Sequence, residues 1–221
     1  MINELFAKKK RYESSLNLIY DNNIHNLRQK VRILIVDDEH FDIIDLLRER
    51  KYDIYYIKDI TYAIEAEPFD IVIIDILGIG KAIGSGMEGF AVAKEIKKRF
   101  PAKQVWCYSG SVIKQEISAQ LQEIDGYIPK DTELDKWVEK LDSIISRYCS
   151  KEYQEDVLRE QLKKCGVDHK DIEKIICEYR AGREGKNFNN FTNILPEYIK
   201  SGKYVIELIK LIYSFASLFA A

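Results

Sequence analysis

The chain has 221 residues, a formal net charge of -2 and 46% hydrophobic residues. This length accommodates one full domain and a smaller second one, and the near-neutral charge argues against bulk nucleic-acid binding. The four cysteines form no Cys-x-x-Cys pair and are too sparse for a disulfide scaffold. A signal peptide is not expected, because the basic residues 8–11 follow the first apolar residues instead of preceding an apolar core. We therefore expect a cytoplasmic protein in a reducing compartment.

Residues 1–29 are predicted to form an N-terminal helical extension. Apolar side chains recur there at near-helical spacing, so the segment is expected to pack on another surface. The basic run 8–11 is typical of a solvated helix face. The apolar residues of this pattern are Leu5, Phe6, Tyr12, Leu16, Ile19 and Tyr20.

Short strands alternate with helical patterns over residues 30–148. Each strand is apolar on both faces and rich in β-branched residues, which is typical of a buried parallel sheet. The alternation predicts an α/β fold, a doubly wound five-stranded parallel sheet of order 2-1-3-4-5 with right-handed crossovers. The expected strands are 32–36, 53–57, 69–74, 104–108 and 125–129, and the expected helices are 41–50, 60–67, 90–96, 113–122 and 134–148.

Charged residues stand at the ends of three of these strands. Asp37 and Asp38 follow the first strand, Asp75 follows the third, and Lys130 follows the fifth. Ligand sites of open α/β sheets form at the carboxyl ends of the strands. We therefore expect three carboxylates and one ammonium group to share a single crevice.

Carboxylates that share a crevice repel one another. Two unit charges about 4 Å apart repel by roughly 4 kcal/mol at an effective dielectric constant near 20, so a proton or a cation must offset the repulsion. Carboxylate oxygens without a nearby His or Cys suit Mg²⁺. Such an ion would orient a phosphoryl donor and leave one carboxylate as the nucleophile. The pattern therefore favours phosphoryl transfer to an aspartate.

A hydroxyl group and an aromatic ring accompany these charges. Ser109 follows the fourth strand, where its hydroxyl can bond a phosphoryl oxygen, and Tyr127 lies three residues before Lys130. With these residues, 30–148 resembles the receiver domain of bacterial response regulators, which has a flavodoxin-like fold. The resemblance implies Mg²⁺ as cofactor, a histidine kinase or a small phosphodonor as partner, and signalling by phosphorylation instead of an enzyme activity on other substrates. It also implies these roles: Asp37 and Asp38 as the metal-binding pair, Asp75 as phosphoacceptor, Ser109 as switch hydroxyl, Tyr127 as switch aromatic, Lys130 as phosphate contact, and Met87-Glu88-Gly89 as the turn that opens the third helix.

Two departures from the family pattern lie beside this site. A glycine-rich stretch, 78–86, makes the segment between Asp75 and the turn glycine longer than in the family. The residue two positions after the phosphoacceptor usually gives a backbone carbonyl to the metal, and Leu77 would hold that place. Lys130 precedes Asp131 where the family has proline, often after a cis bond. We expect a trans bond here, because a cis bond before a non-proline residue is strongly disfavoured.

Residues 149–221 are predicted to be a helical output or interaction domain. A helix is expected to run to about Cys165 and to stop at Gly166. Asp168 can cap a second helix, whose apolar stripe is closed by Gly182. The stripe consists of Ile172, Ile175, Ile176 and Tyr179.

The end of the chain is expected to hold a loop and two more helices. Residues 185–193, rich in Asn and Phe, indicate the loop, and Pro196 suits the first turn of the next helix. The last segment, 203–221, has one narrow polar stripe and is otherwise apolar, so it must be buried. This favours the central helix of a small bundle over a dimer or partner interface and over attachment to a membrane surface. Glu207 and Lys210 interrupt the apolar run, so a membrane-spanning helix is not expected.

Several outputs are compatible with the sequence. A DNA-binding regulator is one alternative, although residues 151–221 carry twelve Lys/Arg against eleven Asp/Glu and show no clear helix-turn-helix. An enzymatic output would need a cluster of catalytic side chains that this region lacks. A phosphorylation-independent, receiver-like adaptor is a further alternative. We expect signalling through a protein partner or self-association of the C-terminal helices, and neither nucleic acid nor membrane as a partner.

Overall fold

The computed structural model describes residues 24–39, 42–79, 88–110 and 121–218. These residues form two compact units, and the boundary between the units in the sequence falls between Tyr148 and Cys149. The predicted division into 1–29, 30–148 and 149–221 stays a prediction. The apolar pattern predicted within residues 1–23 lies outside the described part of the chain.

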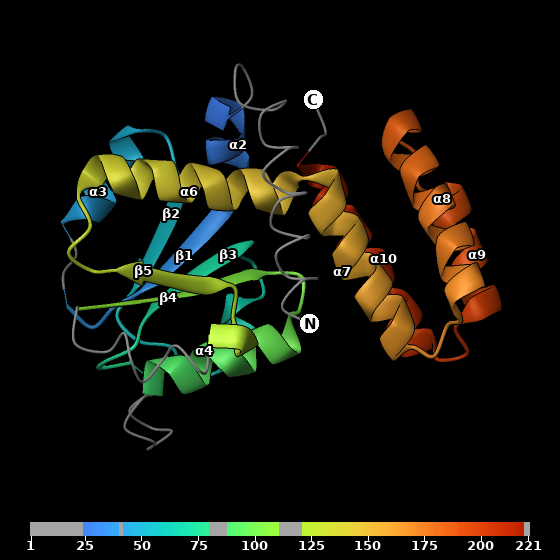
Figure 1. The fold of residues 1–221 in the computed structure, drawn as a ribbon, viewed down its shortest axis with the longest axis horizontal. Helices are drawn as coiled ribbons and strands as arrows, with labels where there is room; N and C mark the ends of the chain where they lie inside the picture. Colours follow the sequence, from blue (N-terminus) through green and yellow to red (C-terminus); the bar gives the residue numbers. More distant parts are fainter. Residues whose placement is uncertain (1–23, 40–41, 80–87, 111–120, 219–221) are drawn as a thin grey trace. The chain divides into compact units, whose positions relative to one another are not determined.

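The first unit contains a five-stranded parallel sheet of order β2-β1-β3-β4-β5 (Figure 1). The predicted fold class and strand order are therefore confirmed. Short, apolar, β-branched segments form these strands because both faces of the sheet are covered by helices. The strands are β1 (Arg32–Val36), β2 (Asp53–Ile57), β3 (Ile71–Asp75), β4 (Gln104–Ser109) and β5 (Gly126–Pro129).

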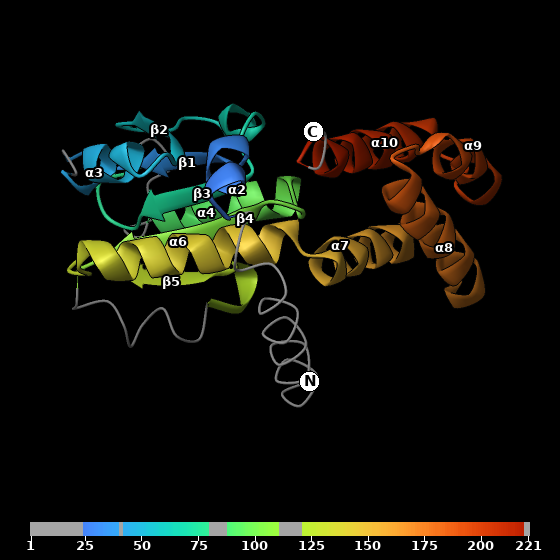
Figure 2. The ribbon, with the colours of Figure 1, turned by 90° about the horizontal axis from the view of Figure 1, so that it is seen from above.

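Helices lie on both faces of the sheet. The helices α3 (Ile43–Glu49) and α6 (Leu134–Cys149) lie on one face and α4 (Glu88–Arg99) on the other (Figures 1 and 2). All three agree with helices predicted at these places in the chain. The fourth predicted helix, 113–122, lies outside the described residues except for a short 3₁₀ turn, η3 (Leu121–Glu123).

The helix predicted over 60–67 is wrong. The structure has only a 3₁₀ turn there, η1 (Ala63–Ala66). Residues 58–70 must return the chain from the end of β2 to the start of β3, which is close to the shortest length for a parallel crossover. The Glu65 carboxylate also accepts hydrogen bonds from the backbone N–H groups of Thr61 and Tyr62, which fixes a tight turn in place of regular helix.

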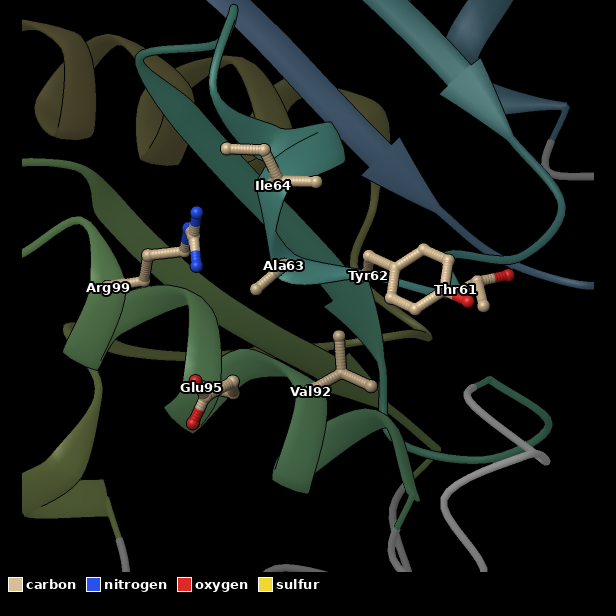
Figure 3. Close-up of a pocket in the computed structure, with 7 residues that line it drawn as sticks. All are labelled: Thr61, Tyr62, Ala63, Ile64, Val92, Glu95 and Arg99. Atoms are coloured by element: carbon tan, nitrogen blue, oxygen red, sulfur yellow. The ribbon is translucent and has the colours of Figure 1, made fainter.

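This short turn leaves a groove between η1 and α4 (Figure 3). The groove has a volume of about 390 Å³. The side chain of Tyr62, 69% exposed, stands at its edge. Its lining consists of Thr61, Tyr62, Ala63 and Ile64 from the turn segment and Val92, Glu95 and Arg99 from α4.

A short helix before the sheet, α2 (Ile24–Lys30), packs against the first unit through a buried charge. The Arg28 guanidinium donates to both carboxylate oxygens of Asp142 on α6, at 2.8 and 2.6 Å. The Tyr52 hydroxyl donates to the same carboxylate at 2.7 Å. This cluster joins α2 and α6 to Tyr52, the residue that directly precedes β2.

In its described residues, the second unit has four helices: α7 (Lys151–Lys164), α8 (His169–Gly185), α9 (Asn189–Tyr198) and α10 (Gly202–Ser217). The predicted stop at Gly166 is confirmed, because this residue has a positive φ of 79° just beyond α7. The predicted cap is confirmed too, since the Asp168 side chain accepts from the N–H groups of Lys170 and Asp171.

The predicted boundaries after α8 are wrong. Gly182 lies within α8, where a Cβ atom would come within 2.7 Å of the Phe188 ring, so its role is close packing and not helix termination. The predicted loop at 185–193 is present only at residues 186–188, and residues 189–193 begin α9, where Phe191 is buried on one face of the helix with Leu195. Pro196 lies near the end of α9 and not in a first turn.

The helix α10 is buried on one side only. Val205, Leu208, Ile212 and Phe215 are buried, whereas Tyr204, Ile206 and Tyr213 are exposed. The favoured placement of this segment as the central helix of a small bundle is therefore wrong for the described residues, whereas the alternative of a partner interface stays a prediction. In the part of the chain that the structure describes, the helices are too short or too polar to cross a bilayer.

A buried carboxylate connects α7 and α8. Glu155, in α7, accepts two bonds from the Arg180 guanidinium at 2.8 and 2.7 Å and one from Arg159 at 3.1 Å. Burial by itself would raise the pKa of Glu155, but the two guanidinium groups outweigh it and hold the pKa below its usual range.

Replacing Glu155 by glutamine is expected to lower the free energy of unfolding by about 1–3 kcal/mol at pH 7. Because the folded-state pKa is depressed, the stabilisation is complete above the unfolded pKa of about 4.3 and is lost as the pH falls through the folded pKa. Urea unfolding of the full chain, followed by circular dichroism at pH 7 and pH 3, should show the difference between wild type and variant shrinking in acid. Glu160→Gln, which removes an exposed pair with Lys163, is the control and should change little. A difference for Glu155→Gln that is equally large at both pH values would contradict this account.

Candidate functional site

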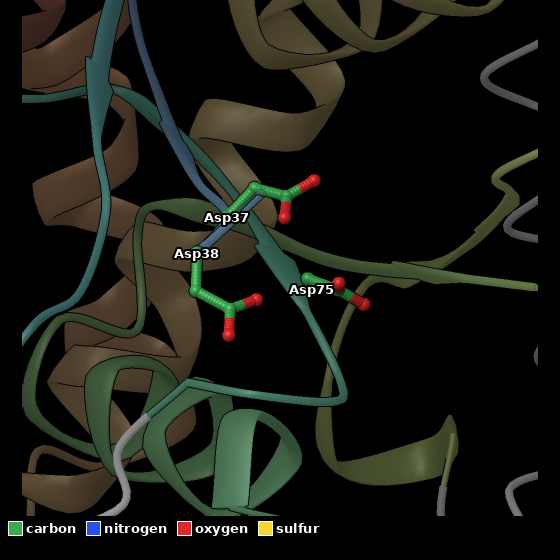
Figure 4. A group of neighbouring side chains, drawn as sticks. All are labelled: Asp37, Asp38 and Asp75. Carbon is green, nitrogen blue, oxygen red and sulfur yellow. The ribbon is translucent and has the colours of Figure 1, made fainter. Parts of the chain in front are cut away.

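Three carboxylates converge at the carboxyl edge of the sheet (Figure 4). Asp37 and Asp38 directly follow β1, and Asp75 is the last residue of β3. Each offers one oxygen atom, and these three atoms all lie within 4.8 Å of one another. Asp37 and Asp75 are buried, whereas Asp38 is exposed. The structure thus brings the three predicted acids together.

Two glycines allow the backbone to approach these carboxylates. Gly78 has a positive φ of 82°, and a Cβ atom there would lie 2.3 Å from the Asp38 carboxylate. A Cβ atom at Gly89, in the first turn of α4, would lie 1.9 Å from the carbonyl oxygen of Asp75. The Gly89 N–H donates to the carbonyl of Ile76 at 3.2 Å. The start of α4 is therefore held directly against the end of β3.

Lys130 stands among the carboxylates. Its Nζ atom lies 2.9 Å from Asp75 Oδ2 and 3.2 Å from Asp37 Oδ2, and 3.8 Å from the exposed Glu39. Burial by itself would lower the pKa of Lys130, but the Asp75 and Asp37 carboxylates outweigh it and raise the pKa. Burial raises the pKa of Asp75, and Lys130 opposes this effect. The ammonium group is thus the counterion of two buried acids.

A backbone hydrogen bond holds Lys130 beside the end of β4. The Lys130 N–H donates to the carbonyl of Ser109 at 2.8 Å. The peptide bonds of the described residues are all trans, so the trans bond predicted between Lys130 and Asp131 is confirmed.

Ser109 and Tyr127 are connected by a hydrogen bond. The Tyr127 hydroxyl donates to the backbone carbonyl of Ser109 at 2.7 Å, and the ring is partly buried. The Ser109 hydroxyl is buried and has no hydrogen-bond partner among the described residues. A buried hydroxyl without a partner is costly, so this group is poised to bond an oxygen atom that enters the site.

Two tyrosines of the site were not predicted. The Tyr108 hydroxyl donates to Asp37 Oδ2 at 2.5 Å, and the Tyr56 hydroxyl lies 2.7 Å from the backbone carbonyl of Asp37. Burial foremost, then the bond to Asp37, raises the pKa of Tyr108, so its hydroxyl stays protonated and donates. The strand register is the feature that indicates Tyr108 as a site residue, because Tyr108 pairs with Asp75 in the sheet.

The donor atoms present fit a hard divalent cation. They are carboxylate oxygens of Asp37, Asp38 and Asp75, and the described residues at this edge of the sheet add no thiol or imidazole. The backbone N–H of Leu77 donates to Asp75 Oδ1 at 3.3 Å, so the position predicted to offer a carbonyl ligand lies next to the acids.

Comparisons with known proteins return solved structures only. No family model matches the chain. No curated protein matches it either. The similar structures include the receiver domain of NtrX from Brucella abortus, at 22% identity over 51% of this chain and 97% of that chain, with a TM-score of 0.44. A response regulator from Thermotoga maritima is similar at 22% identity over 53% of this chain and 98% of that chain, with a TM-score of 0.45.

Longer structures of NtrX from Brucella abortus are also similar. One is 21% identical over 58% of this chain, with a TM-score of 0.48. The chain spans 27% and 29% of the length of two such structures. The similarity to these response regulator structures extends over 51% to 58% of this chain.

Proposed function

We propose that this chain is a phosphorylation-controlled response regulator that accepts a phosphoryl group on Asp75. One observation carries the proposal: a buried carboxylate at a strand end lies next to two further acids, a lysine ammonium group and a buried hydroxyl that lacks a partner among the described residues. In this proposal residues 30–148 are the receiver domain, 1–29 a helical extension and 149–221 the output domain.

The cofactor in this proposal is Mg²⁺, held by Asp37, Asp38, Asp75 and the carbonyl of Leu77. When bound, it would neutralise charge on the transferring phosphoryl group. An oxygen of Asp75 attacks the phosphorus atom, and the bond to the donor's nitrogen or oxygen breaks, with the electron pair leaving on the donor. Lys130 then shifts its ammonium group from the Asp75 carboxylate to a phosphoryl oxygen. The Ser109 hydroxyl donates to another phosphoryl oxygen, which gives this buried group a partner.

The donor would be a partner histidine kinase or a small phosphodonor. The added charge would bias Tyr127, which already bonds the Ser109 carbonyl, and so change the surface around β5. The exposed apolar residues of α10, namely Tyr204, Ile206 and Tyr213, support an output through protein–protein contact. Nucleic acid is not proposed as a partner, because the charges of residues 151–221 nearly balance.

The test is intact-mass analysis after incubation of the full chain with acetyl phosphate and Mg²⁺. Wild type should gain one phosphoryl group, which hydroxylamine removes because it is an acyl phosphate. Asp75→Ala should gain none, and chelation of Mg²⁺ should suppress the wild-type adduct. Asp135→Asn, which changes an exposed acid of α6, is the control and should be modified like wild type.

Two results would contradict the proposal. One is a wild-type chain that gains no phosphoryl group, and the other is an adduct that is undiminished in Asp75→Ala. A signalling activity that persists in Asp75→Ala would instead favour the phosphorylation-independent adaptor.

A further inference from the structure

Tyr108 reaches the acidic site from β4 and has no part in the phosphoryl-transfer steps above. Its side chain is fully buried, and its hydroxyl donates to Asp37 Oδ2 at 2.5 Å. The Lys130 ammonium group lies 5.5 Å from the centre of its ring. On α6, Trp137 meets the same ring edge-on, with ring centroids 6.1 Å apart and an interplanar angle of 84°. The Tyr108 side chain therefore contacts Asp37 and its counterion Lys130 and, through Trp137, the helix α6.

The bond from Tyr108 helps to fix the orientation of the Asp37 carboxylate. Asp37 Oδ1 accepts from the backbone N–H of Glu39 at 2.9 Å, and Oδ2 accepts from Tyr108 and lies 3.2 Å from Lys130 Nζ. The carboxylate is thus held through both oxygens by groups of the chain. Because the phenol is neutral, it orients Asp37 without cancelling the negative charge that attracts a cation. Lys130, by contrast, competes with a cation for the same oxygens.

The two donors on Asp37 Oδ2 differ in what they do during phosphoryl transfer. Lys130 is partly exposed on a flexible chain and turns toward the phosphoryl group. The Tyr108 hydroxyl is attached to a ring that packs against Trp137, so it keeps its position during phosphoryl transfer. Of the two donors, Tyr108 is therefore the one that holds Asp37 when the site is loaded.

We propose that Tyr108 is a positioning residue, whose hydroxyl holds Asp37 in its cation-binding orientation and whose ring transmits the occupancy of the site to Trp137 of α6. The proposal rests on the proposed function, because it requires a divalent cation at the three carboxylates. Without the hydroxyl, Asp37 turns toward Lys130 and forms a closer ion pair, which a cation must then displace.

Calorimetric titration of the full chain with Mg²⁺ tests the positioning role. Tyr108→Phe removes one oxygen atom and should raise the Kd for Mg²⁺ by about fivefold or more, as expected for a hydrogen bond to a charged group. Tyr148→Phe is a matched control, because it removes a buried hydroxyl that donates to Asp70 at 2.8 Å, at the opposite end of β3. Its Kd should equal that of wild type. An unchanged or lowered Kd in Tyr108→Phe would overturn the proposal, as would an equal rise in Tyr148→Phe.

Tryptophan emission tests the link to α6, and its first measurement needs no Tyr108 variant. The chain has two tryptophans, so Trp106→Phe leaves Trp137 as the single reporter. Addition of Mg²⁺ should change the Trp137 emission with the Kd found by calorimetry, and Tyr108→Phe in this background should reduce the change. Emission that does not respond to bound Mg²⁺ would overturn the link.

The results separate this inference from the proposed function. A wild-type chain that binds Mg²⁺ and is phosphorylated, with a Kd unaffected by Tyr108→Phe, refutes the role of Tyr108 alone. A wild-type chain that binds no Mg²⁺ refutes the function and this inference together.

Discussion

Replacing Gly89 by alanine is expected to lower the free energy of unfolding by about 3 kcal/mol or more and to abolish phosphorylation of Asp75. The added Cβ atom would lie 1.9 Å from the Asp75 carbonyl oxygen, far inside van der Waals contact. Relief requires the first turn of α4 to move away from β3. That movement breaks the bond from the Gly89 N–H to the carbonyl of Ile76 and shifts the backbone that positions the acids.

A second helical glycine gives the matched control. Gly185 ends α8, and among the described residues a methyl group added there would meet no heavy atom within 4 Å beyond the adjoining backbone. Gly185→Ala should therefore leave the stability unchanged or raise it by up to about 1 kcal/mol, through the lower conformational entropy of the unfolded chain. Urea unfolding and the intact-mass assay check both variants. A Gly89→Ala chain that is as stable as Gly185→Ala would show that the helix start does not need this close approach.

Asp142→Asn is expected to lower the free energy of unfolding by about 3–5 kcal/mol, as is usual when one partner of a buried ion pair is removed. Asp142 accepts two bonds from Arg28 and one from Tyr52, and the charged side chains are only 9% and 10% exposed. An amide cannot neutralise the guanidinium group, and its NH₂ group would face another donor. The packing of α2 on the first unit should be lost first, because Arg28 is one of its two buried residues.

Asp135→Asn is the control for this prediction. Asp135 also lies on α6 and pairs with Arg50 at 3.4 Å, but the two side chains are 85% and 44% exposed. Its loss should change the stability by less than about 0.5 kcal/mol. Chemical unfolding of both variants at the same pH and salt concentration gives the comparison. Equal stabilities would mean that Arg28 finds another partner in the absence of Asp142.

The sheet and the acids are predictable from the sequence because both depend on short-range patterns. A buried parallel strand is a continuous apolar run, and a residue directly after such a run must lie at the carboxyl edge of the sheet. This rule alone places Asp37, Asp38, Asp75 and Lys130 in one crevice. Ser109 follows from the same rule, whereas Tyr127 lies within the fifth strand and is singled out only through the resemblance to receiver domains.

Other features depend on information that a local pattern lacks. The turn η1 results from the short segment between β2 and β3, which follow one another in the sequence but are separated by β1 in the sheet, whereas apolar spacing alone indicates a helix. The composition at the start of α9, rich in Asn and Phe, is typical of a loop. The burial of Phe191 against the rest of the second unit stabilises a helix there instead. Tyr108 fits the pattern of an apolar strand residue. Its hydroxyl gains a role only through the side of the strand on which it lies and the register of β4 with β3.

Lys130 reduces the net negative charge at the acidic edge of the sheet. Three negative charges and one positive charge leave the cluster of Asp37, Asp38, Asp75 and Lys130 with a formal charge of -2. A single divalent ion brings this sum to zero, whereas monovalent ions would have to enter in pairs. In the proposed function, the remaining charge of these four groups therefore favours one divalent cation over one monovalent cation.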